Sequence, residues 1–275
     1  MRLKKQRKTK MNLILGAIAG DIAGEPYEFG NNRNPEAPLF TPQSTFTDDT
    51  ILTVAVMKIC LSNDFSTENI ADTMADFARR YPSSYGARFG KWILDKTPYG
   101  SLGNGAAMRI SPVYYLKKTL VQKIEIAERI TNVSHNHEES IKWVTALVRL
   151  AEHLKADKDF DISGFMKNEY GINLTNVKYL RENYEYSEKI QNTVPESIAI
   201  LNDSKNFSEV LKNSISIGGD ADTIAAIAGG VAEIIYPIDI ETKEKVFRKL
   251  PDEFKKIVRK FSEEFAEWVY RAKYN

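Results

Sequence analysis

Apolar residues recur every three or four positions through most of this chain, the spacing at which side chains share one face of an α-helix. Two stretches, residues 50–62 and 223–236, are apolar on nearly all sides, which predicts helices buried at the centre of a fold. Further stretches predict amphipathic helices: 68–81, 121–130, 138–155 and 251–272. No run of alternating residues indicates a strand. We therefore expect one all-α domain over residues 11–275, a compact orthogonal bundle of many helices.

Cysteine and histidine are too scarce for several common kinds of site. The 275 residues include one cysteine, Cys60, and three histidines. This excludes a disulfide framework and a Cys-rich zinc or iron–sulfur site, and argues against a metal held only by histidine. Cys60 lies in an apolar run and is expected in the core. Any metal would have to be held by oxygen.

The first ten residues contain six Lys or Arg and no acid, although the net charge of the whole chain is only +1. We expect a disordered, solvated tail; a nucleic-acid or phosphate-binding arm is the alternative. No stretch approaches the ~20 continuous apolar residues of a membrane span. A cytoplasmic protein without a membrane partner is therefore expected.

Three segments interrupt the helical pattern with polar residues that a helix does not need. Two come directly before the two buried helices: Thr47-Asp48-Asp49-Thr50 and Gly218-Gly219-Asp220-Ala221-Asp222-Thr223. The third, residues 16–29, is a small-residue helix that ends in Glu25, Pro26, Tyr27 and Glu28. Asp and Thr before a helix commonly cap its free N–H groups. Capping is the simplest explanation of each segment taken alone.

The two acidic segments together favour a metal site. A cap needs one side-chain oxygen, whereas each segment supplies two carboxylates and at least one threonine. Burying four carboxylates near one another is costly unless cations neutralise them. Mg²⁺ and Mn²⁺ prefer carboxylate, hydroxyl and water oxygens. The segments are thus suited to a pair of such ions at the centre of the bundle, with Asp222 as a possible bridge.

Two further segments have the composition of ligand-binding loops. Residues 100–109 hold three glycines in six positions, and successive glycine N–H groups can cradle an anion; a simple turn is the alternative, here and at residues 85–89. His135 and His137 precede the helix predicted from residue 138, where Ser134 or Asn136 is expected as the cap. These histidines are either donors to a phosphate or ribose hydroxyl or incidental surface groups. His153 is expected to be structural or exposed.

Five motifs in this order resemble the ADP-ribosylglycohydrolase family, which includes the dinitrogenase reductase-activating glycohydrolases: GDIAGEPYEF, FTDDT, GNGAAMRISPV, SHNHEES and GGDADTIAAIAGG. The resemblance runs from about residue 12 to 236 and leaves residues 157–195 unsupported. It implies an all-helical fold, two Mg²⁺ or Mn²⁺ ions and removal of ADP-ribose from modified targets. Glu138 and Glu139 follow the His-Asn-His step where many bacterial members have Pro-Glu-Gly.

The resemblance also implies roles for individual residues. The metal ligands would be Thr47, Asp48, Asp49, Asp220, Asp222 and Thr223. Asp48 or Asp49 would orient the water or act as general base, with Glu28 as the competing candidate. The substrate-binding residues would be Gly86, Ser101, Leu102, Gly103, Asn104, Gly105 and His135.

The implied reaction is metal-assisted hydrolysis of a glycosidic bond to ADP-ribose. Protein ADP-ribosyl-arginine is the favoured substrate, and a monomeric enzyme is expected. Serine-linked, nucleic-acid-linked or free small ADP-ribosides are the enzymatic alternatives. A non-catalytic ADP-ribose-binding or immunity protein and a structural protein on the same fold are the non-enzymatic ones.

Overall fold

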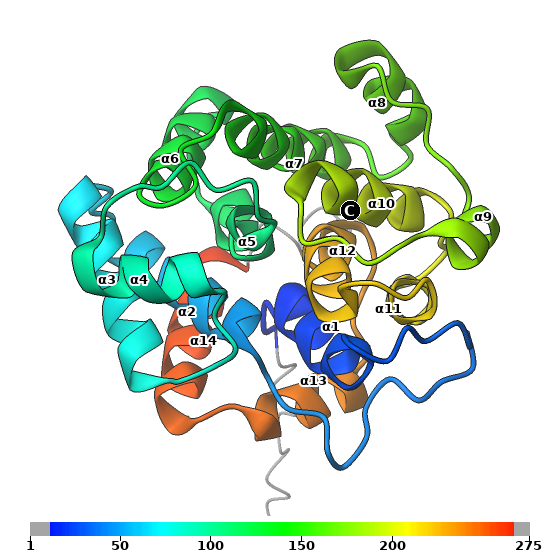
Figure 1. The fold of residues 1–275 in the computed structure, drawn as a ribbon, viewed down its shortest axis with the longest axis horizontal. Helices are drawn as coiled ribbons and strands as arrows, with labels where there is room; N and C mark the ends of the chain where they lie inside the picture. Colours follow the sequence, from blue (N-terminus) through cyan, green and yellow to red (C-terminus); the bar gives the residue numbers. More distant parts are fainter. Residues whose placement is uncertain (1–11, 267–275) are drawn as a thin grey trace, which may run out of the picture.

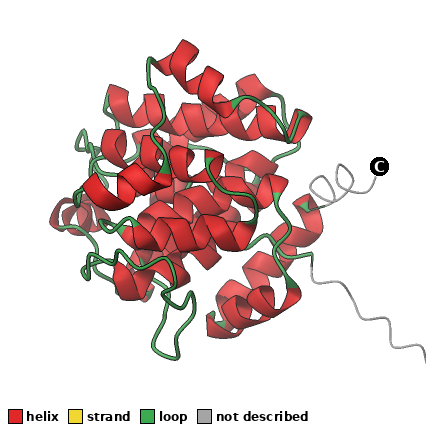
Figure 2. Cartoon of the chain, turned by 90° about the vertical axis from the view of Figure 1, so that its right-hand side faces the viewer, coloured by secondary structure: helices red, strands yellow, loops and turns green. Residues whose placement is uncertain are grey.

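The computed structural model describes residues 12–266 as an all-helical chain, as the apolar periodicity predicts. Within these residues there are fourteen α-helices and two short 3₁₀ helices (Figures 1 and 2). The described part contains no strand, only an isolated bridge between Gly103 and Lys189. No helix in this part is long and apolar enough to cross a membrane.

The helices, with their bounds, are α1 Gly16–Gly24, α2 Asp48–Ser62, α3 Thr67–Arg80, α4 Ala87–Asp95, α5 Gly105–Met108, α6 Leu120–Asn132, α7 Glu138–Ala156, α8 Ile162–Tyr170, α9 Val177–Asn183, α10 Ile190–Asn202, α11 Phe207–Ser216, α12 Ala221–Ile235, α13 Ile240–Lys249 and α14 Asp252–Phe265, with 3₁₀ helices η1 Glu25–Tyr27 and η2 Ser111–Tyr115.

Helices α1 and α12 lie against each other at the centre of the fold (Figure 1). All nine residues of α1 are buried, and so are the residues of α12 from 221 to 234. The two helices run antiparallel, because Gly16 faces Gly229, Gly20 faces Ala225 and Gly24 faces Ala221. A Cβ atom at Gly20 would lie 2.0 Å from the Ala225 carbonyl oxygen. The helices can approach this closely only because these positions of α1 carry no side chain.

One end of the α1–α12 pair is fixed by a buried carboxylate. Glu233, near the end of α12, accepts hydrogen bonds from the backbone N–H groups of Leu15 (2.9 Å) and Gly16 (2.6 Å). These groups belong to the first turn of α1, where no intrahelical acceptor is available. Glu233 therefore caps α1 from the neighbouring helix and fixes the register of the pair. The opposite end brings the residues after α1 beside the start of α12.

The other helices surround this pair. Helix α2 contacts α1, α3 and α14, while α10 and α11 pack against α12 and α7 packs against both α6 and α10. The apolar side chains form one continuous core, which includes Cys60 as expected. The predicted stripe of residues 68–81 is also found in α3, with Ile70, Met74 and Phe77 buried and Tyr81 partly buried.

Several predicted boundaries differ from the structure. The helix expected over residues 16–29 ends at Gly24 and continues as the 3₁₀ turn η1. Helix α14 starts at Asp252, so Pro251 occupies the N-cap position and not the first turn, and its predicted residues beyond 266 lie outside the described part. Residues 157–195 form α8, α9 and the start of α10. The basic residues 1–10 also lie outside the described residues.

The close approach of α1 and α12 predicts that a side chain at Gly20 would destabilise the fold. Gly20→Ala should lower the free energy of unfolding by about 3 kcal/mol or more, because backbone atoms of Ala225 occupy the space of the new methyl group. Gly90→Ala in α4 is the matched control, since its Cβ meets nothing within 4 Å. It should raise the free energy of unfolding by about 0.5–1 kcal/mol through helix propensity. Urea unfolding of both variants measures the difference, and equal stabilities would contradict the packing described.

Candidate active site

The first acidic segment forms the N-terminus of α2. Thr47 is the N-cap, and its Oγ1 accepts a hydrogen bond from the Asp49 N–H at 3.2 Å. Capping therefore explains Thr47, as the simpler interpretation proposed. Asp48 and Asp49 stand in the first turn, and their carboxylates take no part in this cap. The Ser83 hydroxyl donates to Asp48 Oδ1 at 3.3 Å.

Asp21 of α1 fixes the start of α2 through hydrogen bonds. Its Oδ2 accepts the N–H groups of Thr47 and Thr50, each at 3.0 Å, and its Oδ1 accepts the Thr47 hydroxyl at 2.8 Å. The side chain is fully buried. Burial raises the pKa of Asp21 to about 6, although these hydrogen bonds oppose the rise. Sequence patterns offered no indication of this role, because one aspartate in a small-residue helix has no distinctive spacing.

The second acidic segment forms the turn before α12. Gly218 and Gly219 have φ angles of +71° and +74°, which favour glycine, and they turn the chain sharply into the helix. Asp220 is the N-cap residue but makes no side-chain cap, so the capping interpretation is wrong for it. Its Oδ2 instead accepts a hydrogen bond from Asn104 Nδ2 at 2.6 Å. This bond ties the acidic turn to the glycine-rich loop.

The two acidic segments meet where the start of α2 contacts the start of α12, as predicted from the sequence. Thr223 donates to Asp49 Oδ1 at 3.3 Å, and Thr47 Oγ1 lies 3.4 Å from Asp222 Oδ2. These contacts join positions 174 and 175 residues apart in the chain.

Carboxylate oxygens of Glu28, Asp220 and Asp222 come within 4.8 Å of one another. Glu28 follows η1 directly, and sequence analysis assigned it to catalysis and not to metal binding. The structure places it with two of the six predicted ligands. The other four, Thr47, Asp48, Asp49 and Thr223, lie around this acidic triad but outside it.

Burial and mutual repulsion dominate the electrostatics of these groups. Burial, followed by the neighbouring carboxylates, raises the pKa of Glu28 to about 7 and that of Asp222 well above its usual range. Burial also raises the pKa values of Asp48, Asp49 and Asp220. Among the described residues, no Lys or Arg forms an ion pair with any of them.

Asp49 Oδ2 is buried without a hydrogen-bond partner. A buried carboxylate oxygen in this state costs free energy that a bound cation would recover. The donor set consists of hard oxygen atoms only, which fits Mg²⁺ or Mn²⁺.

A cleft of about 430 Å³ opens beside the carboxylates. It is lined by the acidic residues Glu28, Asp48, Asp49, Asp220 and Asp222, and by every residue predicted to bind substrate: Gly86, Ser101, Leu102, Gly103, Asn104, Gly105 and His135. The structure therefore brings the predicted substrate-binding residues to the same cavity as the acidic cluster.

The glycine-rich loop is held in place by a segment that no motif marked. Asn104 N–H donates to the Glu188 carbonyl and Ile190 N–H to the Leu102 carbonyl, both at 2.8 Å. Tyr186, Glu188 and Lys189 also line the cleft. They belong to the interval 157–195, which carried no family motif, so sequence analysis missed them.

The residues around the histidine motif differ in part from expectation. The cap of α7 is His137, whose Nδ1 accepts the Glu139 N–H at 3.1 Å, so the prediction of Ser134 or Asn136 is wrong. Ser134 instead lies 2.8 Å from Nδ1 of the buried His135. His153 is exposed and stacks on Phe160, with ring centroids 4.3 Å apart.

The sequence profile of the family described as ADP-ribosylglycohydrolase matches residues 5–273. The chain belongs to the ADP-ribosylglycohydrolase family. This confirms the resemblance carried by the five motifs, and the match extends through residues 157–195.

Three comparisons place this glycohydrolase family member among its relatives. It is 28% identical to an uncharacterized protein of Archaeoglobus fulgidus over 80% of this chain and 85% of that one. It is 25% identical to the ADP-ribosyl-[dinitrogen reductase] glycohydrolase of Rhodospirillum rubrum over 83% and 86%. A solved ADP-ribosylglycohydrolase-related protein complex matches with a TM-score of 0.66 at 19% identity, over 91% and 95% of the chains. The last likeness concerns the fold alone.

The role of Asp21 in this family member can be measured. Asp21→Ala should lower the free energy of unfolding by about 2–4 kcal/mol, because it leaves the partly buried N–H of Thr47 and the buried N–H of Thr50 without this acceptor. Asp21→Asn retains an acceptor oxygen and should cost less. Asp239→Ala, which removes the exposed cap of α13, is the control and should cost about 1 kcal/mol. Denaturant unfolding would refute the role if Asp21→Ala cost no more than Asp239→Ala.

Proposed function

We propose that this protein is a divalent-metal-dependent hydrolase that removes ADP-ribose from modified protein side chains, with ADP-ribosyl-arginine as its substrate. The observation that carries this proposal is the convergence of carboxylates without cationic partners in the cleft that the glycine-rich loop also lines. Family membership supports the same chemistry. The name of the Rhodospirillum rubrum relative specifies a modified protein as its substrate, which favours a protein target here.

Two Mg²⁺ or Mn²⁺ ions are the proposed cofactors. Glu28, Asp220 and Asp222 would hold one, since their oxygens already converge. The second ion would be held by Thr47, Asp48, Asp49 and Thr223. Bound ions would stabilise negative charge as Lewis acids and serve as a template for the ribose hydroxyls.

The carboxylates also have a role of their own in the proposed reaction. Loss of the modified side chain leaves oxocarbenium-like positive charge on the ribose, which nearby carboxylates stabilise. Asp48 lines the cleft and receives one hydrogen bond, from Ser83, so it retains acceptor capacity to orient the attacking water. Glu28 lines the same cleft and is the competing candidate for this role. All of these side chains come from one chain, so a monomer suffices.

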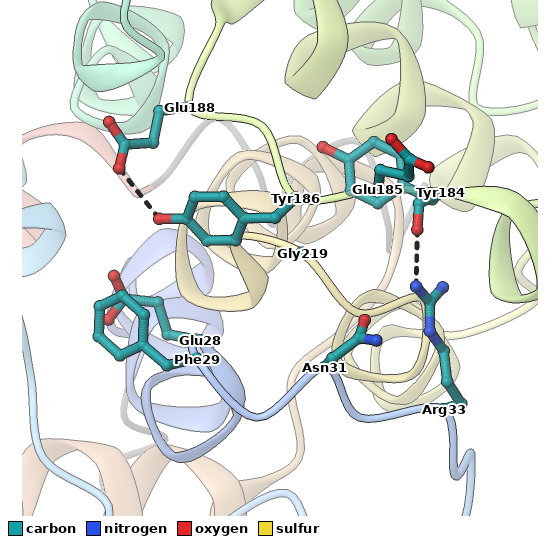
Figure 3. Close-up of a pocket in the computed structure, with 9 residues that line it drawn as sticks. All are labelled: Glu28, Phe29, Asn31, Arg33, Tyr184, Glu185, Tyr186, Glu188 and Gly219. Carbon is teal, nitrogen blue, oxygen red and sulfur yellow. Dashed lines mark hydrogen bonds between the residues drawn. The ribbon is translucent and has the colours of Figure 1, made fainter.

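A second pocket, adjoining the cleft, supports the arginine linkage. It has a volume of about 540 Å³ and shares Glu28, Tyr186 and Glu188 with the cleft (Figure 3). Glu185 adds another carboxylate, and Phe29 an exposed aromatic ring. Carboxylates and aromatic faces are the groups that bind a guanidinium ion. A neutral serine linkage would use neither.

Arg33 is the one cationic side chain in the lining of this pocket. Its guanidinium is already engaged, because Nη2 donates to the Tyr184 carbonyl at 2.6 Å and Nη1 to the Arg181 carbonyl at 2.9 Å. Arg33 thus fixes the chain around residues 181–184. The carboxylates of Glu185 and Glu188 keep the pocket net acidic and suited to a cationic side chain.

Release of ADP-ribose from ADP-ribosyl-arginine, assayed with Mg²⁺, with Mn²⁺ and with EDTA, tests the proposed function. We expect release with either metal and none with EDTA. Asp222→Asn should lower both metal affinity and turnover by roughly 100-fold, because it removes a carboxylate ligand. Asp252→Asn, at an exposed position, should change neither.

Metal-dependent release of ADP-ribose only from serine- or nucleic-acid-linked substrates would show that the arginine linkage is wrong. The assignment as a metal-dependent hydrolase would stand. Tight ADP-ribose binding without turnover of any substrate would favour a non-catalytic binding protein. Full activity of Asp222→Asn with unchanged metal content would refute the metal assignment.

The linkage can be tested separately through the acidic pocket. A double variant, Glu185→Gln with Glu188→Gln, should lower kcat/KM on ADP-ribosyl-arginine about fivefold to tenfold, because two charge-assisted contacts to guanidinium are lost. The same variant should change kcat/KM on ADP-ribosyl-serine less than twofold. Glu182→Gln, which is exposed and outside the pocket, is the control. Equal losses on both substrates would remove the argument for arginine.

A further inference from the structure

His135 is buried at the base of the glycine-rich loop. Its Nε2 atom faces this loop, since a Cβ atom would lie 3.3 Å from Nε2 at Gly105 and 3.6 Å from it at Gly103. The ring of Tyr99 packs beside the imidazole, with centroids 5.7 Å apart. A side chain at Gly105 would therefore crowd the Nε2 edge of His135. The glycines leave that edge open toward the cleft.

The other ring nitrogen, Nδ1, ends a chain of hydrogen bonds that begins at Arg109. Arg109 Nη2 donates to Ser134 Oγ at 2.9 Å, and Ser134 Oγ lies 2.8 Å from His135 Nδ1. An arginine has only donors, so Ser134 Oγ must accept this bond. A serine oxygen can accept two hydrogen bonds, but among the described residues Ser134 Oγ contacts no other acceptor for its own hydrogen. This hydrogen is therefore donated to Nδ1, which accepts it. In a neutral imidazole this places the ring hydrogen on Nε2.

We propose that Arg109 and Ser134 are positioning residues that hold His135 as a neutral imidazole with its hydrogen on Nε2, aimed at the Gly103–Gly105 loop as a hydrogen-bond donor. The group recognised is an acceptor oxygen of the ligand, either a phosphate or a ribose hydroxyl. Only the identity of this ligand rests on the proposed function.

The charges around His135 fit a neutral donor. Arg109 is completely buried, and Arg88 lies over the face of the Tyr99 ring. Burial, followed by these two cations, holds the pKa of His135 well below its usual range. A protonated imidazole would donate from both nitrogens and would break the bond from Ser134. The arrangement thus selects a donor that does not depend on protonation of the ring.

A purely structural role explains Arg109 poorly. Its Nε and Nη1 atoms are buried and have no hydrogen-bond partner, which is costly for a guanidinium. Burial lowers its pKa to about 10, so the group remains charged at neutral pH. An apolar side chain would fill the same space at lower cost. Arg109 also lines the cleft, and its Nη2 donates to the Ile130 carbonyl at 3.4 Å as well as to Ser134. The shorter bond, to Ser134, connects this buried cation to His135.

The tautomer of His135 can be measured directly by ¹⁵N NMR of the full-length protein labelled at histidine. Its signals are assigned by comparison with His137→Gln and His153→Gln, because the chain has three histidines. We expect a ¹⁵N spectrum with a protonated Nε2 and an unprotonated Nδ1. The opposite tautomer in the wild-type protein would overturn the proposal, whether or not the protein hydrolyses any substrate.

Ser134→Ala removes the donor to Nδ1 and should shift the tautomer away from a single Nε2–H form. Affinity for ADP-ribose, measured by calorimetry, should fall about fivefold to tenfold, the worth of one hydrogen bond. Ser134→Thr restores the hydroxyl and should recover both the Nε2–H tautomer and the affinity for ADP-ribose. Ser214→Ala is the matched control, because this equally buried serine bonds within α11 and does not line the cleft.

An unchanged tautomer and affinity in Ser134→Ala would overturn the proposal. If neither Ser134 variant folds, the proposal is tested by the wild-type ¹⁵N spectrum together with the tautomer and the ADP-ribose affinity of Arg109→Lys. Lysine keeps the charge but loses the planar fork, so the proposal expects a mixed tautomer and weaker ADP-ribose binding. A single Nε2–H tautomer with unchanged affinity in Arg109→Lys would remove Arg109 from the chain. Failure of hydrolysis alone would bear on the proposed function and not on this arrangement.

Discussion

The close backbone contact between α1 and α12 brings the residues that follow α1 beside the acidic turn that precedes α12. Glycines spaced four residues apart on α1 face small residues spaced four apart on α12, so the helices touch without intervening side chains. Glu233 fixes their register at one end. At the other end, Glu28 meets Asp220 and Asp222. A contact made almost wholly of small residues thus ends at the acidic centre, where Gly24 faces Ala221 and Asp222.

Two clusters of charged groups in the protein differ in whether a buried or half-buried carboxylate has a cationic side chain beside it. Glu152 pairs with Lys123 at 2.8 Å and Lys155 at 2.7 Å, and these cations lower its pKa despite the burial. Asp49 and Asp222 have no such partners, and their pKa values rise. Burying like charges together is unfavourable for folding by itself. The first cluster is complete as folded, whereas the second has the composition of a site that a cation completes.

Local patterns predicted the helices and the acidic segments well, because both leave signals within a few residues. Apolar periodicity is a property of one helix, and Asp48, Asp49, Asp220 and Asp222 stand out because each pair exceeds what a cap needs. Asp21 escaped prediction because its role depends on Thr47 and Thr50, which only the fold brings near. Tyr186 and Glu188 escaped for a similar reason. The cap of α7 was misplaced because Ser134 bonds to His135 and Asn136 accepts the N–H of Gly100, which only the fold brings near.

The separation of the two acidic segments along the chain has a consequence for biosynthesis. Thr47 and Asp222, which meet in the site, are 175 positions apart. At about 5–20 residues per second, a ribosome needs roughly 10–35 s to pass from one to the other. Throughout that interval α12 has not been made and cannot cover the glycine face of α1. Neither the cap from Glu233 nor the acidic triad exists until the last quarter of the chain is made. A cation that needs both acidic segments would therefore bind only after the central helix pair is complete. A chain stopped before residue 220 contains Glu28, Asp48 and Asp49 but neither Asp220 nor Asp222.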